Sequence, residues 1–240
     1  MYSVPEELSR TAMVISPEAL ERLREKRVAV FGVGGVGGYV CEALCRTGIG
    51  RFDLIDSDRV SLSNINRQII ALHSTVGQLK VDVMRSRMQD INPSCSVNTY
   101  PVFFSEENAS DFPFREFDYV CDCIDSVRSK TALIRICSEQ GIPVISAMGA
   151  GNKKDPSQLK VADIYSTKVC PLAKVIRTSL RKLGVSSLKC VYSEEEPVRT
   201  AAETAAETGT ESVKRVPGSL SWMPSSMGLM IASEVIRDLI

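Results

Sequence analysis

A glycine-rich segment and an acidic residue that follows it can together hold a nucleotide. Residues 32–37 read Gly-Val-Gly-Gly-Val-Gly, with glycines at Gly32, Gly34, Gly35 and Gly37. Glycine permits a tight turn and a close approach of backbone N–H groups to phosphate oxygens. Asp56 comes 24 residues after Gly32, a spacing at which a carboxylate accepts hydrogen bonds from ribose hydroxyls.

A run of polar side chains after Asp56 can manage the charge of a triphosphate. The residues concerned are Asp58, Asn64, Arg67, Gln68 and Lys80. An arginine and a lysine neutralise phosphate charge as a nucleophile attacks phosphorus, and Asp125, after a later apolar run, can hold Mg²⁺ nearby. Taken singly, Asp58 and Gln68 are better explained as surface residues, but the joint pattern favours function. The alternative is a nicotinamide-dependent dehydrogenase, and this polar segment does not suit the apolar pocket that such an enzyme needs.

The elements that must position these residues alternate between strands and helices. We expect strands over 27–31, 51–55, 95–102, 118–124 and 141–147, and helices over 35–46, 76–92 and 128–140. This alternation predicts an α/β, Rossmann-like fold whose mainly parallel sheet carries helices on both faces.

The pattern changes after residue 149. Strands are expected over 158–165 and 188–192, with an amphipathic basic helix over 171–183 and a closing helix over 225–239. Residues 193–217 are rich in Glu, Ala and Thr and have no clear apolar periodicity. We therefore expect a Rossmann-like domain over 1–192, an exposed acidic linker over 193–218, and a C-terminal extension over 219–240 that packs on the same domain.

The sequence resembles the ubiquitin-activating / molybdopterin- and thiamine-pathway adenylyltransferase superfamily, and within it the bacterial tRNA threonylcarbamoyladenosine dehydratases. The superfamily motifs are the glycine segment, Asp56-x-Asp58, Asn64-x-Asn-Arg67-Gln68, Lys80 and Cys123-Ile-Asp-Ser126. The dehydratase motifs are Arg10-Thr-Ala, Glu42 to Gly50, Asp125-Ser-Val-Arg-x-Lys130, Gly149-Ala-Gly151 and Pro171-Leu-Ala-Lys174. The resemblance covers residues 8–192 well and the closing helix loosely.

The resemblance implies how ATP is bound and used. The backbone of Gly34 and Gly35 and the side chains of Asp56, Asn64, Arg67, Gln68 and Lys80 would hold ATP, and Asp125 would hold Mg²⁺. The family joins a carboxylate to AMP with loss of pyrophosphate. In the dehydratases the carboxylate belongs to the threonyl group of a modified adenosine beside the tRNA anticodon, and an internal nucleophile then closes a ring and expels AMP. Superfamily members usually form homodimers in which an N-terminal arginine, here Arg10, reaches the partner's phosphates, although Arg10 suits a surface position equally well.

The charge distribution favours tRNA over a carrier protein as the substrate. The whole chain has a formal net charge of zero, but residues 151–192 carry +7 and residues 193–240 carry −4. A local excess of cations suits the phosphates of an RNA stem. The alternatives are an adenylyltransferase for a ubiquitin-like sulfur-carrier protein and a non-enzymatic partner of sulfur-transfer proteins. The two Cys-x-x-Cys zinc pairs that many sulfur-carrier enzymes have are absent from the sequence.

The remaining features predict a reduced, cytoplasmic protein with no stable membrane insertion. The N-terminal residues 1–7 lack the basic and apolar regions of a signal peptide, and the apolar C-terminal run is broken by charges. Cys170, which precedes Pro171, is a candidate reactive thiol, but we favour a packed side chain. Trp222, with Met223, Met227 and Met230, is expected in the core or in a subunit interface, and His73 receives no role.

Overall fold

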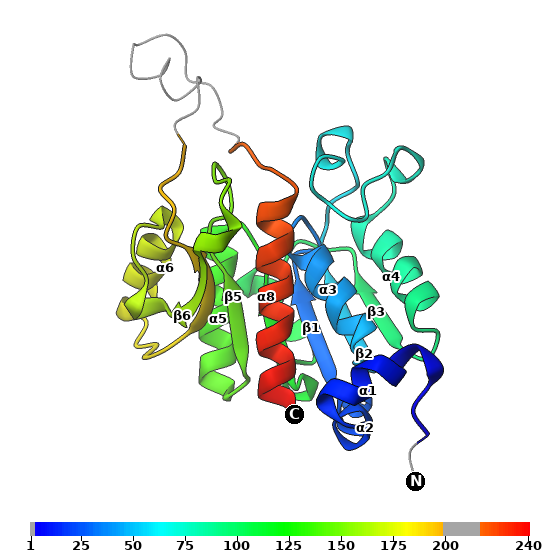
Figure 1. Cartoon of the computed structure of the whole chain (residues 1–240). Helices are drawn as coiled ribbons and strands as arrows, with labels where there is room; N and C mark the ends of the chain where they lie inside the picture. Colours follow the sequence, from blue (N-terminus) through cyan, green and yellow to red (C-terminus); the bar gives the residue numbers. More distant parts are fainter. Residues whose placement is uncertain (1–2, 199–216) are drawn as a thin grey trace.

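A seven-stranded sheet runs through the middle of the molecule (Figure 1). The computed structural model describes residues 3–198 and 217–240. The strands are β1 (Arg27–Phe31), β2 (Arg51–Ile55), β3 (Ser96–Tyr100), β4 (Tyr119–Asp122), β5 (Val144–Ala147), β6 (Leu159–Asp163) and β7 (Lys189–Ser193). Their order is β3-β2-β1-β4-β5-β7-β6, and only the β6–β7 pair is antiparallel. The prediction of a mainly parallel sheet is confirmed.

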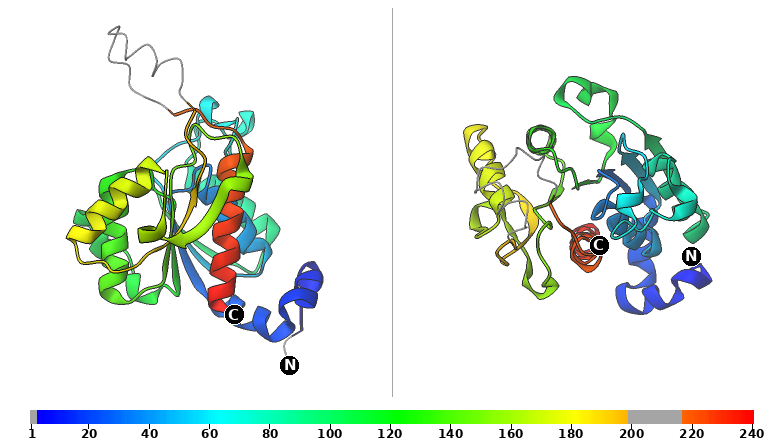
Figure 2. Two further views of the ribbon diagram at one scale, coloured as in Figure 1. Left: turned by 60° about the vertical axis from the view of Figure 1, so that its left-hand side comes forward. Right: turned by 90° about the horizontal axis from the view of Figure 1, so that it is seen from above.

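Helices cover both faces of the sheet. They are α1 (Ser9–Ile15), α2 (Pro17–Glu25), α3 (Gly37–Arg46), α4 (Lys80–Ile91), α5 (Val127–Gln140), α6 (Pro171–Lys182) and α8 (Trp222–Leu239). The view from above in Figure 2 places α5 and α8 on opposite sides of the sheet. Buried residues of α3, α4 and α8 share one apolar cluster, whereas those of α5 lie in two others, one of which it shares with α6.

Alternating side chains of the strands build these two layers. Along β1, Val28 and Val30 face the cluster under α3 and α8, while Ala29 and Phe31 face the cluster under α5. Successive side chains of a strand point to opposite faces, so a strand buried on both sides needs an unbroken apolar run. Such a run made β1 predictable to the residue, whereas the run of β2 is interrupted by the buried Asp53.

The carboxyl ends of the central strands meet at one edge of the sheet. The register pairs Phe31 of β1 with Ile55 of β2 and with Asp122 of β4, and it pairs Asp122 with Ser146 of β5. The chain proceeds outward from β1 to β3 and then returns to β4 on the other side of β1. Such a switch point leaves a crevice outside the strand ends, where ligands bind in open α/β sheets.

Several expected elements are shorter than predicted; β4, β5 and β6, for example, span only 119–122, 144–147 and 159–163. The helix expected from residue 76 begins only at Lys80, because Gly77 has a φ of 87° and Arg59 pairs with Leu79 in an antiparallel bridge. The strand expected to reach Val102 ends at Tyr100. Helices α1 and α2 occupy residues for which the sequence predicted no element.

The C-terminal helix α8 is part of the main core. Met223, Met227, Ile231 and Val235 are fully buried in the cluster that α3 shares. A Cβ on Gly228 would lie 2.5 Å from the Val36 carbonyl oxygen, so the two helices touch through a glycine. Among the described residues, no helix is long and apolar enough to span a bilayer.

The start of the expected exposed linker is buried. Ser193 is the last residue of β7 and is fully buried, and Glu195 is 9% exposed. The Glu195 carboxylate accepts hydrogen bonds from the backbone N–H groups of Lys154 and Asp155. Residues 199–216, the greater part of that linker, lie outside the described residues.

Candidate functional site

A cavity of about 550 Å³ opens at the carboxyl ends of the central strands. It is lined by nearly all the residues that the sequence nominated: Gly32, Gly34, Gly35, Asp56, Asp58, Asn64, Arg67, Gln68, Lys80 and Asp125. Two nominated residues, Gly37 and Arg10, do not line it. The sheet topology thus brings residues that lie far apart in the sequence to one place.

The four glycines of the loop between β1 and α3 do different things. Gly32 has a φ of 89°, and a Cβ there would lie 2.7 Å from the Cys123 carbonyl oxygen. A Cβ on Gly37 would lie 1.8 Å from the Gly32 oxygen. These two glycines are therefore required for packing. Gly34 has only a side-chain nitrogen of Gln68 within 4 Å of such a Cβ, so its backbone faces the cavity, as does that of Gly35.

Asp56 secures the glycine loop through its carboxylate. Its Oδ2 accepts a hydrogen bond from the Val33 N–H at 2.7 Å, and its Oδ1 accepts one from the Asp58 N–H at 2.8 Å. The expectation from the sequence was an acceptor for ribose hydroxyls. Each carboxylate oxygen has a further lone pair, so a ribose contact remains compatible with this loop-holding role.

Lys80 lies between two acids on the cavity wall. Its Nζ donates to Asp58 Oδ2 at 2.7 Å and lies 4.0 Å from Asp56 Oδ2. Lys80 is buried, whereas the Asp58 side chain is 65% exposed. Burial raises the pKa of Asp56 above its ordinary value, and the Lys80 cation opposes that rise. Asp58, which singly suited a surface position, is exposed and is also the ion-pair partner of Lys80.

The loop after β2 contributes three polar side chains. Asn64 Oδ1 accepts from the Ser61 N–H, which shapes the turn. Arg67 lies across from Gly35 and donates through Nη1 to Ser63 O and Asn66 Oδ1. Gln68 is 6% exposed, and its Oε1 has no hydrogen-bond partner among the described residues. A buried acceptor without a partner at a cavity wall is available to a ligand.

Asp125 stands after β4 on the opposite side of the glycine loop. It is exposed and lines the cavity. In the described part of the chain, no group of three or more His, Cys, Asp or Glu side chains can hold a metal ion. Mg²⁺ needs only one or two carboxylates when phosphates and waters complete its octahedron. One carboxylate therefore fits Mg²⁺ that arrives with a nucleotide and does not fit a resident structural metal.

Several cavity residues were not nominated from the sequence. Val102, Phe103 and Phe104 line it beyond β3, and Phe103 is 59% exposed. The segments 147–151 and 217–219 complete the wall. The Asn66 side chain donates to the Ser219 backbone oxygen, which ties the second of these segments to the loop of Arg67. Apart from Gly149-Ala-Gly151, which the sequence offered only as part of a family motif, these residues carry no chemical signature in a sequence.

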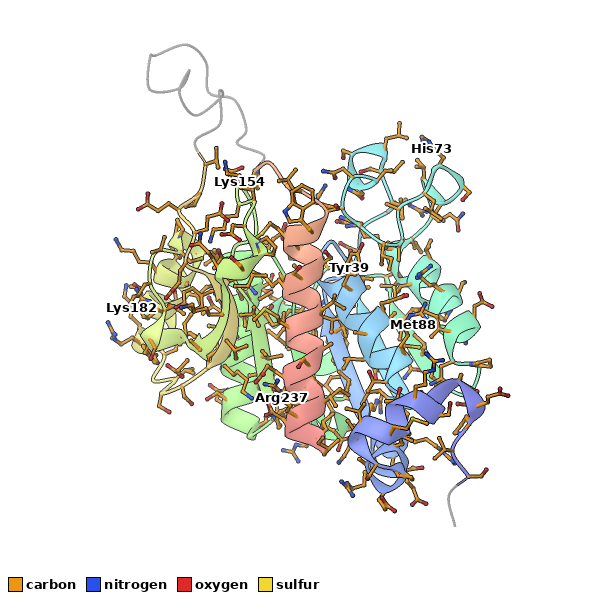
Figure 3. All side chains as sticks on the ribbon, in the orientation of Figure 1. Tyr39, His73, Met88, Lys154, Lys182 and Arg237 are labelled. Carbon is orange, nitrogen blue, oxygen red and sulfur yellow. The ribbon has the colours of Figure 1, made fainter. Side chains whose placement is uncertain are left out.

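The cysteines and the tryptophan do not supply a nucleophile to this cavity. Cys170 is buried in the apolar cluster under α6, as favoured from the sequence. Cys123 lines the cavity, but burial, and then the Asp122 charge, raise the pKa of its thiol to about 12. Trp222 is half exposed and so lies outside the core, the first of its two expected places, while Met223 and Met227 are in the core. His73 lies on an exposed loop (Figure 3).

The basic residues of 151–192 divide into two groups. Three of the nine are held by contacts within the protein: Lys153 is buried and donates to Ser193 O, Arg177 donates to backbone oxygens, and Lys189 pairs with Asp238. A fourth, Lys160, has a side chain 54% exposed and pairs with Glu194 at the surface. The other five are exposed: Lys154, Lys168, Lys174, Arg181 and Lys182. Figure 3 shows Lys154 near the upper end of α8 and Lys182 on the outer side of α6.

The proximity of Lys80 to Asp56 has a testable effect on the pKa of Asp56. Because its folded pKa is raised, Asp56 ionises at a higher pH than a free aspartate, and its ionisation reduces stability as the pH rises through that range. Replacing Lys80 by Met should raise this pKa further, since the opposing cation is lost. Carboxyl ¹³C NMR titration of both proteins measures it, with Asp155 as the distant control. If the titration midpoint of Asp56 were unchanged or lowered in Lys80→Met, Lys80 would not be the cation that opposes the rise of the Asp56 pKa.

Comparison with known proteins places this site in a family. The ThiF family model matches residues 8–240. The tRNA threonylcarbamoyladenosine dehydratase of Bacillus subtilis is 42% identical, covering 98% of this chain and 94% of the relative, and that of Escherichia coli is 36% identical, covering 95% and 91%. A crystal structure of the E. coli dehydratase in complex with ATP aligns with a TM-score of 0.88 at 32% identity, over 99% of this chain and 97% of that one. The chain therefore belongs to the ThiF family and, within it, to the tRNA threonylcarbamoyladenosine dehydratases.

Proposed function

We propose that this protein uses ATP to adenylylate the threonyl carboxylate of threonylcarbamoyladenosine in tRNA and then promotes ring closure with release of AMP. One observation carries the proposal: the glycine loop, Asp56, Arg67, Lys80 and Asp125 surround one cavity at the switch point of the sheet. Relatives matched over nearly the whole chain bear the dehydratase name, and one of them was crystallised with ATP.

The residues of the cavity have distinct parts in the first step. The backbone N–H groups of Gly34 and Gly35, next to the start of α3, face the phosphates, and the helix dipole favours their negative charge. Arg67 and Lys80 supply cations as the carboxylate attacks the α-phosphorus and pyrophosphate leaves. Asn64 and Gln68 orient the nucleotide, and the exposed Phe103 and Val102 offer an apolar surface to the base. These roles extend the expectations from the sequence.

Asp125 would hold Mg²⁺ against the phosphates of ATP. When bound there, the metal ion neutralises charge on the phosphate oxygens. The exposure of the carboxylate in the cavity fits this role, because the ion enters and leaves with the nucleotide.

The second step needs no enzyme thiol. A carboxylate oxygen is a poor leaving group, and attachment to AMP allows it to depart with the phosphate when an internal nucleophile attacks the carbonyl carbon. Both reacting groups belong to one substrate, so proximity replaces a covalent enzyme intermediate. The raised pKa of Cys123, the cysteine at the cavity wall, keeps its thiol protonated at neutral pH, which agrees with a mechanism without thiol transfer.

The central experiment follows the mass of the modified nucleoside. Purified protein is incubated with ATP, Mg²⁺ and tRNA that carries threonylcarbamoyladenosine, and digested tRNA is analysed by mass spectrometry. We expect loss of one water from the nucleoside in an ATP-dependent reaction, and loss of this activity in Arg67→Ala and Asp125→Ala. Unchanged tRNA, together with pyrophosphate exchange that depends on a sulfur-carrier protein, would instead support the alternative substrate.

The outer face of α6 is the proposed contact for the tRNA stem. Ala173, Ile176 and Leu180 are buried, so the helix turns Lys174, Arg181 and Lys182 to the solvent. Arg181 also lies over the ring of Tyr165, with its Cζ 5.4 Å from the centroid. Leu172, at the start of the same helix, lines the cavity. RNA phosphates bound along α6 would therefore approach the cavity mouth.

This surface can be tested by the dependence of tRNA binding on salt. A Lys174→Gln, Arg181→Gln, Lys182→Gln variant should bind tRNA more weakly, and the slope of log K against log salt should decrease by roughly 2 to 3. Lys160→Gln with Lys189→Gln is the matched control, because those lysines are paired with Glu194 and Asp238. An equal effect per removed charge in both sets would show that only the total charge matters.

A homodimer is the proposed assembly, and two exposed apolar surfaces support it. Helix α1 has no buried residue, and its Met13 and Val14 are each 84% exposed. Leu62 and Leu72, in the loop between β2 and α4, are also exposed. Figure 1 draws that loop beyond α4, at the end of the molecule opposite α1. A twofold axis would bring each surface against its counterpart's opposite end. Arg10, on α1 and remote from its own cavity, would then reach the partner's cavity.

Mixing of two inactive variants tests whether the active sites are shared. Arg10→Ala and Asp125→Ala should each be inactive alone, and mixed dimers should regain part of the activity because one cavity then has both residues. Sedimentation measures the dimer itself. If mixed dimers had no activity, or if Arg10→Ala were fully active, Arg10 would be a surface residue with no role in the partner's cavity.

A cytoplasmic location is also proposed. Both tRNA and ATP are found in that compartment, and all eight cysteines are free thiols in the structure.

A further inference from the structure

We infer that the buried ion pair of Lys130 and Asp122 positions two walls of the nucleotide cavity. Both side chains are fully buried, and Lys130 Nζ lies 2.8 Å from Asp122 Oδ2. Lys130 is in the first turn of α5, and Asp122 ends β4. Neither residue lines the cavity. This positioning role rests on the proposed function, because it acts through the residues that would hold ATP.

Every polar atom of the pair has a partner. The three N–H groups of the Lys130 ammonium match three acceptors: Asp122 Oδ2, Ser146 Oγ at 3.1 Å and Ala147 O at 3.0 Å. Asp122 Oδ2 also accepts from the Ser146 hydroxyl at 2.5 Å. Asp122 Oδ1 accepts from the Ile124 N–H at 3.2 Å. A buried network that is fully satisfied defines one arrangement of its members.

The network joins two segments that face the cavity. The bond to Ile124 fixes the turn that leads into Asp125, and the bond to Ala147 fixes the end of β5. Ile124, Asp125 and the segment 147–151 all line the cavity. One ion pair therefore sets the distance between the acid proposed for Mg²⁺ and the glycine segment 149–151.

Stability alone does not explain a lysine at this position. A cation in the first turn of a helix opposes the helix dipole. Replacing a buried ion pair by apolar side chains of similar volume is often neutral or stabilising. A pair of apolar side chains could therefore maintain the fold. The two charges are then explained by the positioning of the cavity walls.

A charge-free double variant separates positioning from stability. In Asp122→Asn with Lys130→Met, the amide oxygen can still accept from Ile124, the amide N–H can donate to Ser146, and Met fills the volume of the lysine stem. We expect a melting temperature within about 4 °C of the wild type. Turnover should fall about 10- to 100-fold, with faster hydrogen exchange at the amides of 124–125 and 147–151.

Asp53→Asn is the matched control. Asp53 is buried and pairs with Arg27, which begins β1 at the end remote from the cavity. This variant should lower the melting temperature while turnover and exchange at the cavity stay unchanged. Ser146→Ala retains both charges and should change exchange at the same amides to a smaller extent, which keeps the test decisive if the double variant does not fold.

Three results would overturn the inference: wild-type turnover and exchange in the double variant, a turnover loss that merely follows a loss of stability, or unchanged exchange in Ser146→Ala. Hydrogen exchange and the ATP dissociation constant need no tRNA. If the wild type does not modify tRNA, the proposed function fails, and these two measurements still decide whether Lys130 positions the cavity walls.

Discussion

The close approach of the glycine loop to the end of β4 is the constraint on which the site depends. Gly32 donates its N–H to Ile55 O at 2.8 Å, and a Cβ at this residue would lie 2.7 Å from Cys123 O. The ends of β1, β2 and β4 therefore meet at one glycine with a positive φ. Asp56 follows one of these strands and Asp125 follows another, so both acids lie at the cavity because the backbones can come so close.

The acids and cations of the cavity act as one coupled group. Asp56 holds the loop through Val33, Lys80 is drawn between Asp56 and Asp58, and the Lys80 backbone N–H donates to Asp58 O. The cation that would face the phosphates is thereby fixed before any nucleotide binds. A preorganised charge of this kind needs no rearrangement during the reaction, which is the source of most electrostatic catalysis.

The elements whose residue pattern reflects burial could be predicted from the sequence. Segments whose structure depends on distant contacts could not. The apolar run of β1 ends at Gly32, and the mostly apolar β2 ends at Asp56, so the predicted bounds of both strands match the structure. The segment 76–79 has a helical pattern, but its backbone pairs with residues 58–60, and such pairing is a tertiary effect that no local pattern contains. Phe103 and the segment 217–219 lacked any chemical signature, and Lys130 looked like an ordinary helix lysine apart from its place in a motif.

The number of basic residues in a segment likewise does not show how many of them are accessible to a ligand. Residues 151–192 have a net charge of +7, yet the structure commits three of their nine cations to internal contacts and pairs a fourth, Lys160, with Glu194 at the surface. What remains accessible is narrower: Lys154 and Lys168, and the outer side of α6. Because Leu172, near the start of α6, lines the cavity, a phosphate backbone bound along the exposed cations of α6 would approach the loops proposed to hold ATP. The direction of the helix, more than the number of charges, would bring the modified adenosine to the site where it reacts.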